Sequence, residues 1–396
     1  MKPETRVPIG FGEVLSAYKR SLLDDENAVP FFEEEFSRYV GVRRAKCVSR
    51  GRIALYLTIK ALNIKQGEEV ILPAYTSPIV PEVLMRCGVK PVFAQVDTNS
   101  LNILPQGIGQ VISARTRAIV AVHMFGNPCR IDEIREIAAQ NNLFLIEDAA
   151  QALGAEYLNR KVGSFGDVGI FSFGLGKNMT TVEGGMITSQ NNGFMDRIES
   201  IMKCVRASHF LNFRMALELF LYPALTSPIP YEIISRLRRP VRETHRFDKH
   251  EALIEYNGLQ ATFGRMQLKK VDAMNERRMM NAKRIIEGIR HIRWLLPQKV
   301  EGGARPVFTR LILKHNRGKD RRDLLIHHLR RSSFDIPKLG DYFLARYADY
   351  PQDTAETALF REIKKEIVEK ILVLPTSPSL EEQDLKMIVH VLVSNG

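Results

Sequence analysis

Three side chains with complementary chemistry, a carboxylate, a hydroxyl and an amine, lie in one stretch of the chain between residues 144 and 187. Asp148 ends an apolar run, Ser172 lies in a second apolar run, and Lys177 follows a glycine-rich turn. Short apolar runs bounded by turn signals are typical of buried strands. Because ligands of α/β proteins bind at the carboxyl ends of strands, we expect the three side chains to meet there.

This set of groups fits the chemistry of pyridoxal phosphate. The aldehyde of this cofactor needs a lysine amine for a Schiff base, and its ring nitrogen needs a carboxylate that keeps it protonated. Its phosphate needs hydroxyls and backbone N–H groups. We therefore predict these roles for Lys177, Asp148 and Ser172, respectively. Taken singly, each residue also has an ordinary interpretation, as a solvated lysine, a helix cap or a small buried side chain.

A second candidate for the phosphate contact is the turn at Gly51 and Arg52. The run that begins at Cys47 reads as a strand that turns through Gly51 into a helix with one apolar face. A glycine before a helix presents backbone N–H groups and the positive end of the helix dipole to an anion. The alternative is an ordinary turn before a helix, because a single glycine is a weak signal.

The order of the motifs resembles one known family. The segments ILPAYTSP, KPVFAQVD, AVHMFGNP, IEDAAQALGA, VGSFGDVGIFSFGLGKN and EGGMI are similar, in this order, to those of the DegT/StrS-type sugar aminotransferases. The Ser-Phe-x-x-x-Lys-Asn run, placed between Glu-Asp-x-Ala-Gln and Gly-Gly, is a specific signature. The match runs from about residue 49 to residue 188 and resumes more weakly to the C-terminus.

The resemblance implies a pyridoxal-phosphate aminotransferase of fold type I that forms a homodimer with its site at the interface. Glutamate is the amino donor that the resemblance implies, and a nucleotide-linked keto-sugar is the implied acceptor. Lys177 and Asp148 are then the catalytic residues, with Lys177 moving the proton as general base and acid. The implied cofactor-binding residues are Gly51, Arg52, Thr76, Asp148, Gln151, Ser172, Lys177 and Asn257.

Some positions depart from the family pattern. Arg52 stands where the family has a threonine, and Ser77 stands where it has an aromatic residue or histidine stacked on the cofactor ring. Leu253 stands where the family has an asparagine that reaches the phosphate of the partner subunit, so Asn257 is a shifted candidate for that contact. The alternatives are a solvent-facing helix residue for Gln151 and a polar helix-surface residue for Asn257.

Strands and helices alternate along much of the chain, which predicts an α/β fold with a mainly parallel sheet flanked by helices. We expect a large cofactor-binding domain over residues 1–275, with a helical arm at 11–40, and a smaller α+β domain over 276–396. The remaining expected elements are strands at 70–73, 91–96, 118–122, 143–146, 168–173, 185–188 and 306–314, and helices at 131–141, 250–290, 322–331 and 381–393.

Residues 206–242 form the least typical segment. This segment is rich in apolar residues, is broken by prolines and ends in the basic cluster Arg236, Arg238, Arg239 and Arg242. It is not a membrane-spanning helix. One hypothesis is peripheral contact with a membrane surface, and the other is an insertion packed on the dimer partner or over the active site.

The composition limits the other function classes. The net charge of +12 favours anionic partners or a solvated basic surface, but no zinc-finger or RNA-binding signature accompanies it, so we expect no specific nucleic-acid binding. The four cysteines lack metal spacing and read as free thiols of a reducing cytoplasm. No secretory signal is visible at the N-terminus, and we predict no metal site.

Three alternatives remain open. Some relatives dehydrate sugars and carry a histidine in place of the lysine, which Lys177 argues against. A non-catalytic binding or regulatory protein on the same fold would explain the departures at Ser77, at Leu253 and at Glu255, which stands where the family has an arginine. A transaminase at a membrane surface, acting on a lipid-linked sugar, would explain the segment 206–242.

Overall fold

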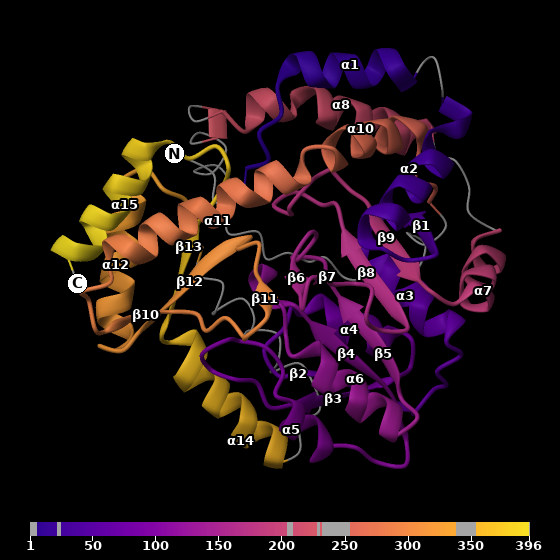
Figure 1. Cartoon of the computed structure of the whole chain (residues 1–396), viewed down its shortest axis with the longest axis horizontal. Coiled ribbons are helices and arrows are strands. Elements are labelled where there is room, and N and C mark those ends of the chain that lie inside the picture. The colour runs from indigo at the N-terminus through magenta and orange to yellow at the C-terminus, as the bar shows by residue number, and fades with distance from the viewer. Residues whose placement is uncertain are drawn as a thin grey trace.

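A seven-stranded sheet forms the centre of the molecule (Figure 1). The computed structural model describes residues 6–21, 25–203, 209–227, 230–231, 254–337 and 354–395. The strand order is β1-β9-β8-β5-β4-β2-β3. The strands are β1 (Arg44–Val48), β2 (Glu69–Pro73), β3 (Lys90–Ala94), β4 (Thr116–Val122), β5 (Phe144–Asp148), β8 (Val168–Ser172) and β9 (Gly185–Ser189).

The sheet is mainly parallel, as the alternating pattern predicted. β3, β2, β4, β5 and β8 run parallel to one another, whereas β9 runs antiparallel to both β8 and β1. Every residue of β2 and of β9 is buried. Strands covered on both faces read as continuous apolar runs rather than as alternating ones, which explains the pattern in the sequence.

Helices cover both faces of this sheet. α3 (Gly51–Ala61) and α4 (Ile79–Arg86) share one apolar cluster with Val120, Ile146 and Ile170, and α3 also contacts α7 (Asn192–Met202). α5 (Pro105–Gly109) and α6 (Ile131–Gln140) pack on the other face, in a cluster with Ile119 and Leu145. Because successive residues of a strand point to opposite faces of the sheet, the two layers of helices bury alternate residues of each strand.

Four helices form a further layer beside β1 and β9, along the upper edge in Figure 1. They are α1 (Phe11–Ser21), α2 (Asp25–Val40), α8 (His209–Leu225) and α10 (Gly258–Leu268). α10 contacts α1 and α2, and α1 contacts α8. Residues 11–40 are thus helical as expected, apart from 22–24, which lie outside the described residues.

The C-terminal part contains a second, three-stranded antiparallel sheet in the order β10-β12-β13. Its elements are β10 (Leu295–Pro297), β12 (Arg310–His315), α12 (Lys319–Arg331), α14 (Thr354–Ile363), a π-helix (Lys364–Val368), β13 (Ile371–Pro375) and α15 (Glu382–Ser394). α11 (Val271–Gly288) leads into it and runs across the expected boundary at residue 275, so the domain division stays a prediction.

Small elements complete the described fold. A short sheet pairs β7 (Arg160–Lys161), β6 (Glu156–Tyr157) and β11 (Ala304–Arg305), and a 3-10 turn covers Met124–Gly126. The strand expected over 306–314 begins only at Arg310, and the helical stretch expected over 250–290 is divided between α10 and α11.

The atypical segment 206–242 is described only in part. Residues 209–225 form α8, whereas the basic cluster Arg236, Arg238, Arg239 and Arg242 lies outside the described residues, as do Cys204 and Leu253. Within the described ranges, none of the helices is long and apolar enough to cross a membrane.

Candidate active site

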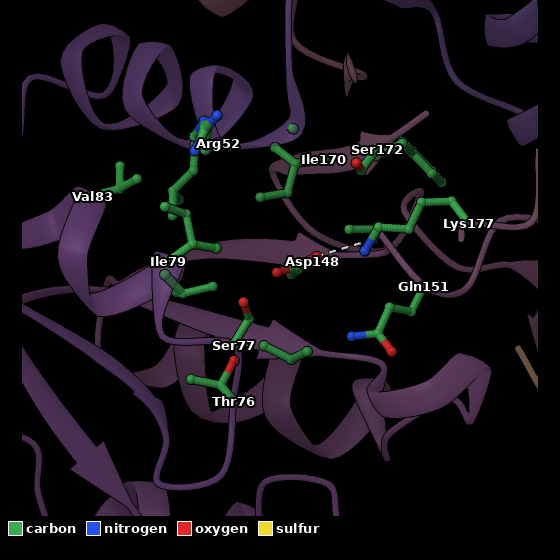
Figure 2. A pocket seen from close by; sticks show the side chains of 16 residues that line it. Arg52, Thr76, Ser77, Ile79, Val83, Asp148, Gln151, Ile170, Ser172 and Lys177 are labelled. Atoms are coloured by element: carbon green, nitrogen blue, oxygen red, sulfur yellow. Dashed lines mark hydrogen bonds between the residues drawn. The ribbon is translucent and has the colours of Figure 1, made fainter. Parts of the chain in front are cut away.

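One pocket brings together seven of the eight residues predicted to bind the cofactor (Figure 2). It lies where the carboxyl ends of β5 and β8 meet the N-termini of α3 and α4, and it encloses about 580 Å³ out to its open mouth. The seven residues are Gly51, Arg52, Thr76, Asp148, Gln151, Ser172 and Lys177. Ser77 also lines it, with an apolar wall formed by Leu55, Ile79, Val80, Val83, Val122, Ile170 and Phe171.

Asp148 is the last residue of β5 and is buried. The N–H of Ala150 donates to its Oδ1 at 3.0 Å, which fixes the orientation of the carboxyl group. Burial raises the pKa of this carboxyl, against that hydrogen bond and the positive charges of Lys177 and His123. A cationic group placed against Asp148 would favour the charged carboxylate, as a protonated ring nitrogen does.

Lys177 lies in the loop between β8 and β9, and in Figure 2 its side chain reaches into the pocket towards Asp148. Burial lowers the pKa of its amine to about 8, with the charge of Arg310 adding to the decrease and that of Asp148 opposing it. At pH 7 roughly a tenth of the amine is therefore neutral, far more than for a lysine with its ordinary pKa. Only the neutral amine can act as a nucleophile or as a base.

The loop that carries Lys177 is held at both ends. Gly176 adopts a φ of 83°, a left-handed conformation that favours glycine and turns the chain immediately before the lysine. Asn178 donates to Asn275 Oδ1 at 2.9 Å, and the Phe173 N–H donates to the Gly184 oxygen at 2.9 Å. The glycine-rich run in the sequence thus becomes a fixed turn that aims the amine.

Gly51 and Ser172 form a cradle at the N-terminus of α3. A Cβ on Gly51 would lie 2.8 Å from the Ser172 Cβ and 3.2 Å from its Oγ, so a larger residue would displace that hydroxyl. The side chain of Arg50 does not cap this helix and pairs with Glu183 instead. Backbone N–H groups at a helix N-terminus, together with a hydroxyl, form a suitable binding site for a phosphate group.

These residues fit pyridoxal phosphate, which the sequence predicts for this position. Gln151 follows β5 in a turn, so it is not the solvent-facing helix residue of the alternative interpretation, and it lines the pocket. Its buried Oε1 has no hydrogen-bond partner among the described residues. A buried amide oxygen without a partner is costly, and a ligand in the pocket would satisfy it. The amine, carboxylate, amide and helix terminus together supply a partner for each polar part of this cofactor.

Asn257 is the one predicted cofactor residue that does not line this pocket. It caps α10 by accepting from the Gln260 N–H at 2.9 Å, and its amide donates to Asn212 Oδ1 at 3.0 Å. The Gln260 side chain completes a capping box at the same position. The signal for this role was present in the sequence as Asn-x-x-Gln before a helical pattern. A contact from Asn257 to the cofactor of a partner subunit stays a prediction.

Two ionic features near the pocket were missed by sequence reasoning. Arg310, at the start of β12, lies close enough for its charge to act on Lys177. Arg50, immediately before Gly51, pairs with Glu183 at 2.6 Å, and Glu183 also pairs with Arg214 of α8 at 3.1 Å. The glutamate before the Gly-Gly motif was visible in the sequence, but the sequence contained no signal for its partners.

The comparisons with known proteins agree with one another. A model of the DegT/DnrJ/EryC1/StrS aminotransferase family matches residues 11–216 and 232–393. The match therefore omits part of the atypical segment 206–242. The chain is 39% identical over 175 residues to a GDP-perosamine synthase of Vibrio cholerae, which covers 44% of this chain and 46% of that protein.

Similarity extends over most of the chain in two further cases. The chain is 32% identical over 302 residues to the spore coat polysaccharide biosynthesis protein SpsC of Bacillus subtilis, with 76% of this chain and 72% of that protein covered. The solved structure of an aminotransferase from Psychrobacter cryohalolentis matches with a TM-score of 0.79 and 25% identity, over 98% of each chain. The fold is therefore that of fold-type I aminotransferases.

Proposed function

Because the chain belongs to the DegT/DnrJ/EryC1/StrS aminotransferase family, whose enzymes depend on pyridoxal phosphate, we propose that it moves an amino group from glutamate to a nucleotide-linked keto-sugar. The chain is thus a pyridoxal-phosphate-dependent enzyme of a sugar aminotransferase family. The observation that carries the proposal is the meeting of Lys177, Asp148 and Gln151 in one pocket beside the N-terminus of α3.

Bound pyridoxal phosphate supplies an aldehyde that takes up amino groups and a protonated ring that accepts the electrons released at the donor's α-carbon. Lys177 would hold the cofactor through its amine and, when released, would move the proton to and from that carbon. Its pKa of about 8 suits both directions of proton transfer near neutral pH, because the two protonation states are then both populated.

The other residues of the pocket would hold the cofactor and orient its ring. Asp148 would keep the ring nitrogen protonated, and Gln151 would donate to or accept from the ring through its amide. Ser172 Oγ and the N-terminus of α3 at Gly51 and Arg52 would hold the phosphate. Thr76 and Ser77 follow β2 directly and lie at the same edge, where they would complete the wall of the pocket.

The chemistry of the pocket supports an anionic acceptor. Arg52 lines the pocket, Arg310 lies near Lys177, and the whole chain carries a net charge of +12. Cationic groups at a site favour substrates that carry phosphate. The name of the Vibrio cholerae relative, a GDP-sugar enzyme, supports a nucleotide as the carrier, and that of SpsC supports a role in surface polysaccharide formation.

The proposal includes a homodimer in the cytoplasm. The family resemblance supports two subunits with the pocket at their interface, and the pocket in one chain has an open mouth that a second subunit could close. The thiols of Cys47, Cys87 and Cys129 are free and buried, which is in keeping with a reducing compartment.

The test begins with the absorbance spectrum of the purified protein, followed by borohydride reduction and peptide mapping. We expect a yellow protein whose cofactor becomes fixed on Lys177, and loss of the yellow colour on addition of glutamate. A protein that stays colourless with added cofactor would contradict the proposal and favour a non-catalytic binding protein on this fold.

The acceptor is tested in a second step with the glutamate-treated enzyme. Nucleotide-linked keto-sugars are added one at a time, and the yellow colour and an aminated product in the mass spectrum are measured together. Return of the colour with a nucleotide-linked keto-sugar supports the proposed acceptor. Return only with sugars that lack the nucleotide would limit the proposal to a sugar aminotransferase with a different carrier.

A further inference from the structure

The helices α1 and α8 together expose a group of large apolar side chains, which we call the α1–α8 face. Large apolar side chains on it are exposed by 38% or more, with Phe213 at 69% and Leu15 at 56%. Its members are Phe11, Leu15, Phe213, Leu217, Phe220, Leu221 and Leu225. Single exposed apolar residues are normal on a protein surface, but a contiguous group marks a contact site.

α8 is apolar on two sides. Met215, Leu219 and Tyr222 are buried and attach it to the protein, at the spacing of one helical face. Phe213, Leu217 and the pair at 220 and 221 recur at the same spacing on the side that faces solvent. A helix that is covered by protein on one side only has no reason to carry a second apolar stripe unless something else covers it.

Contacts between the two helices hold the face together. The rings of Phe11 and Phe220 lie edge to face with their centroids 6.1 Å apart, and the Tyr18 hydroxyl donates to the Ala216 oxygen. In Figure 1 the two helices run next to each other along the outer edge of the molecule. The two helices therefore form one surface, the α1–α8 face, which points away from the rest of the protein.

α8 is also fixed to the body of the protein by charge. Arg214 pairs with Glu183 at 3.1 Å, and Glu183 in turn pairs with Arg50 beside the candidate active site. Its other charged residue, Glu218, lies 3.4 Å from the Arg214 guanidinium. The exposed stripe of α8 is thus apolar, and its one acidic residue is partnered by an arginine of the same helix.

The last turn of α1 is basic. Lys19 and Arg20 are exposed in the last turn of α1. The acidic residue of the same helix, Glu13, is turned away, since its carboxylate accepts from Gln267 at 2.5 Å and lies 2.9 Å from the Lys270 amine. The chain as a whole has 57 basic against 45 acidic residues, which is the source of its net positive charge.

We propose that the α1–α8 face binds the surface of an anionic lipid membrane, with the two helices lying in the plane of the interface. Aromatic and leucine side chains would enter the boundary between head groups and acyl chains, and Lys19 and Arg20 would pair with lipid phosphates. This is the arrangement of interfacial amphipathic helices, which gain affinity from buried apolar area and from attraction to anionic head groups.

Charge complementarity favours lipid over a second copy of the chain as the occupant. Two copies that met through this face would each bring Lys19 and Arg20 to the contact, and of the two carboxylates on the described parts of α1 and α8, Glu13 is turned away and Glu218 is paired with Arg214. A phosphate-rich surface supplies the missing negative charge at every position.

Vesicle flotation of the full-length enzyme, loaded with cofactor, tests the proposal. We expect it to float with phosphatidylcholine vesicles that contain phosphatidylglycerol and to stay behind with phosphatidylcholine alone. Leu217→Glu and Leu15→Glu should each weaken binding by about tenfold or more, because each puts a charge into the apolar boundary. The double variant Lys19→Glu, Arg20→Glu should bind the anionic vesicles more weakly, as the unaltered enzyme should at high salt concentration.

Met387→Glu is the matched control, because Met387 is 46% exposed on α15, away from this face. It should bind vesicles like the unaltered enzyme. Melting temperature and cofactor absorbance of every variant show whether it is folded. The proposal is overturned if the unaltered enzyme fails to float with anionic vesicles, or if Leu217→Glu floats as well as the control. If the unaltered enzyme is a dimer that does not float, and Leu217→Glu converts it to a monomer, a second copy of the chain covers the face.

Discussion

Glu147 and Asp148 are neighbours in the chain, yet their carboxylates serve opposite faces of β5. Glu147 accepts from the N–H groups of Gly163, Phe165 and Gly166 at 2.6 to 2.8 Å and lies 3.2 Å from His123 Nε2. Asp148 lines the pocket instead. Because successive strand side chains point to opposite faces, one carboxylate organises a loop and the other is available for chemistry.

This division predicts different outcomes for two isosteric substitutions. Glu147→Gln should destabilise the protein by about 2 to 4 kcal/mol, since an amide cannot accept the same set of buried hydrogen bonds. Asp148→Asn should leave the melting temperature nearly unchanged while amino transfer falls roughly 100-fold or more, because the ring nitrogen loses its anionic partner. Thermal melting and turnover separate the two effects, and equal losses of stability in both variants would contradict the assignment.

In the protein without cofactor, Lys177 lowers the free energy of unfolding. Its pKa is lowered from 10.5 to about 8, so the folded state disfavours the charged amine. Lys177→Met should therefore raise the free energy of unfolding by about 1 to 3 kcal/mol near neutral pH. The gain in stability should shrink from about pH 8, the pKa in the folded state, to about pH 10.5, the ordinary pKa that applies in the unfolded state. In this range the amine is neutral in the folded protein but still charged in the unfolded chain. Urea unfolding at several pH values measures it, and a gain that grows with pH would contradict this explanation.

The same pKa predicts how fast the cofactor is taken up. Only the neutral amine attacks an aldehyde, so uptake by the cofactor-free enzyme should accelerate as the pH rises and level off above the Lys177 pKa of about 8. A lysine with its ordinary pKa would still accelerate uptake up to about 10.4. Stopped-flow absorbance follows the reaction, and a plateau that is absent below pH 10 would show that the amine is not perturbed.

Gly51 tests the phosphate cradle. In Gly51→Ala the new methyl group would lie 2.8 Å from the Ser172 Cβ. We expect cofactor affinity to fall by about 10- to 100-fold, the equivalent of a local overpacking cost of 1 to 3 kcal/mol. Gly109→Ala is the control, since a Cβ there meets nothing within 4 Å. If both variants bind the cofactor normally in a fluorescence titration, the phosphate does not lie against Gly51.

Asn257 distinguishes a helix cap from a contact to the cofactor. Asn257→Ala should lower stability by about 1 kcal/mol, since it removes the cap of α10. Asn257→Ser keeps a capping oxygen and should recover most of that loss. If Asn257 only caps the helix, cofactor affinity stays unchanged in both variants. A loss of affinity without a loss of stability would instead support the predicted contact across the dimer interface.

The sequence by itself determined the chemistry and most of the fold class. Asp148 and Ser172 end strands, and Gln151 and Lys177 follow them closely in the chain. Because the carboxyl ends of parallel strands meet at one edge, the convergence of these residues could be predicted. The alternation of apolar strands and amphipathic helices likewise determined a covered, mainly parallel sheet. These inferences are local, because each depends on periodicity and on turn residues that are close together in the chain.

Only the tertiary structure decided the features that depend on distant partners. Arg50 and Glu183 are separated by 133 positions, and no pattern in either segment predicts that the two side chains form an ion pair. The contact of the Asn257 amide with Asn212, 45 positions away in the chain, likewise has no signal in either segment. For α8, both sides are apolar in the sequence, so periodicity could not tell the buried stripe from the exposed one. Which side meets the core is a property of the neighbouring helices rather than of α8 itself.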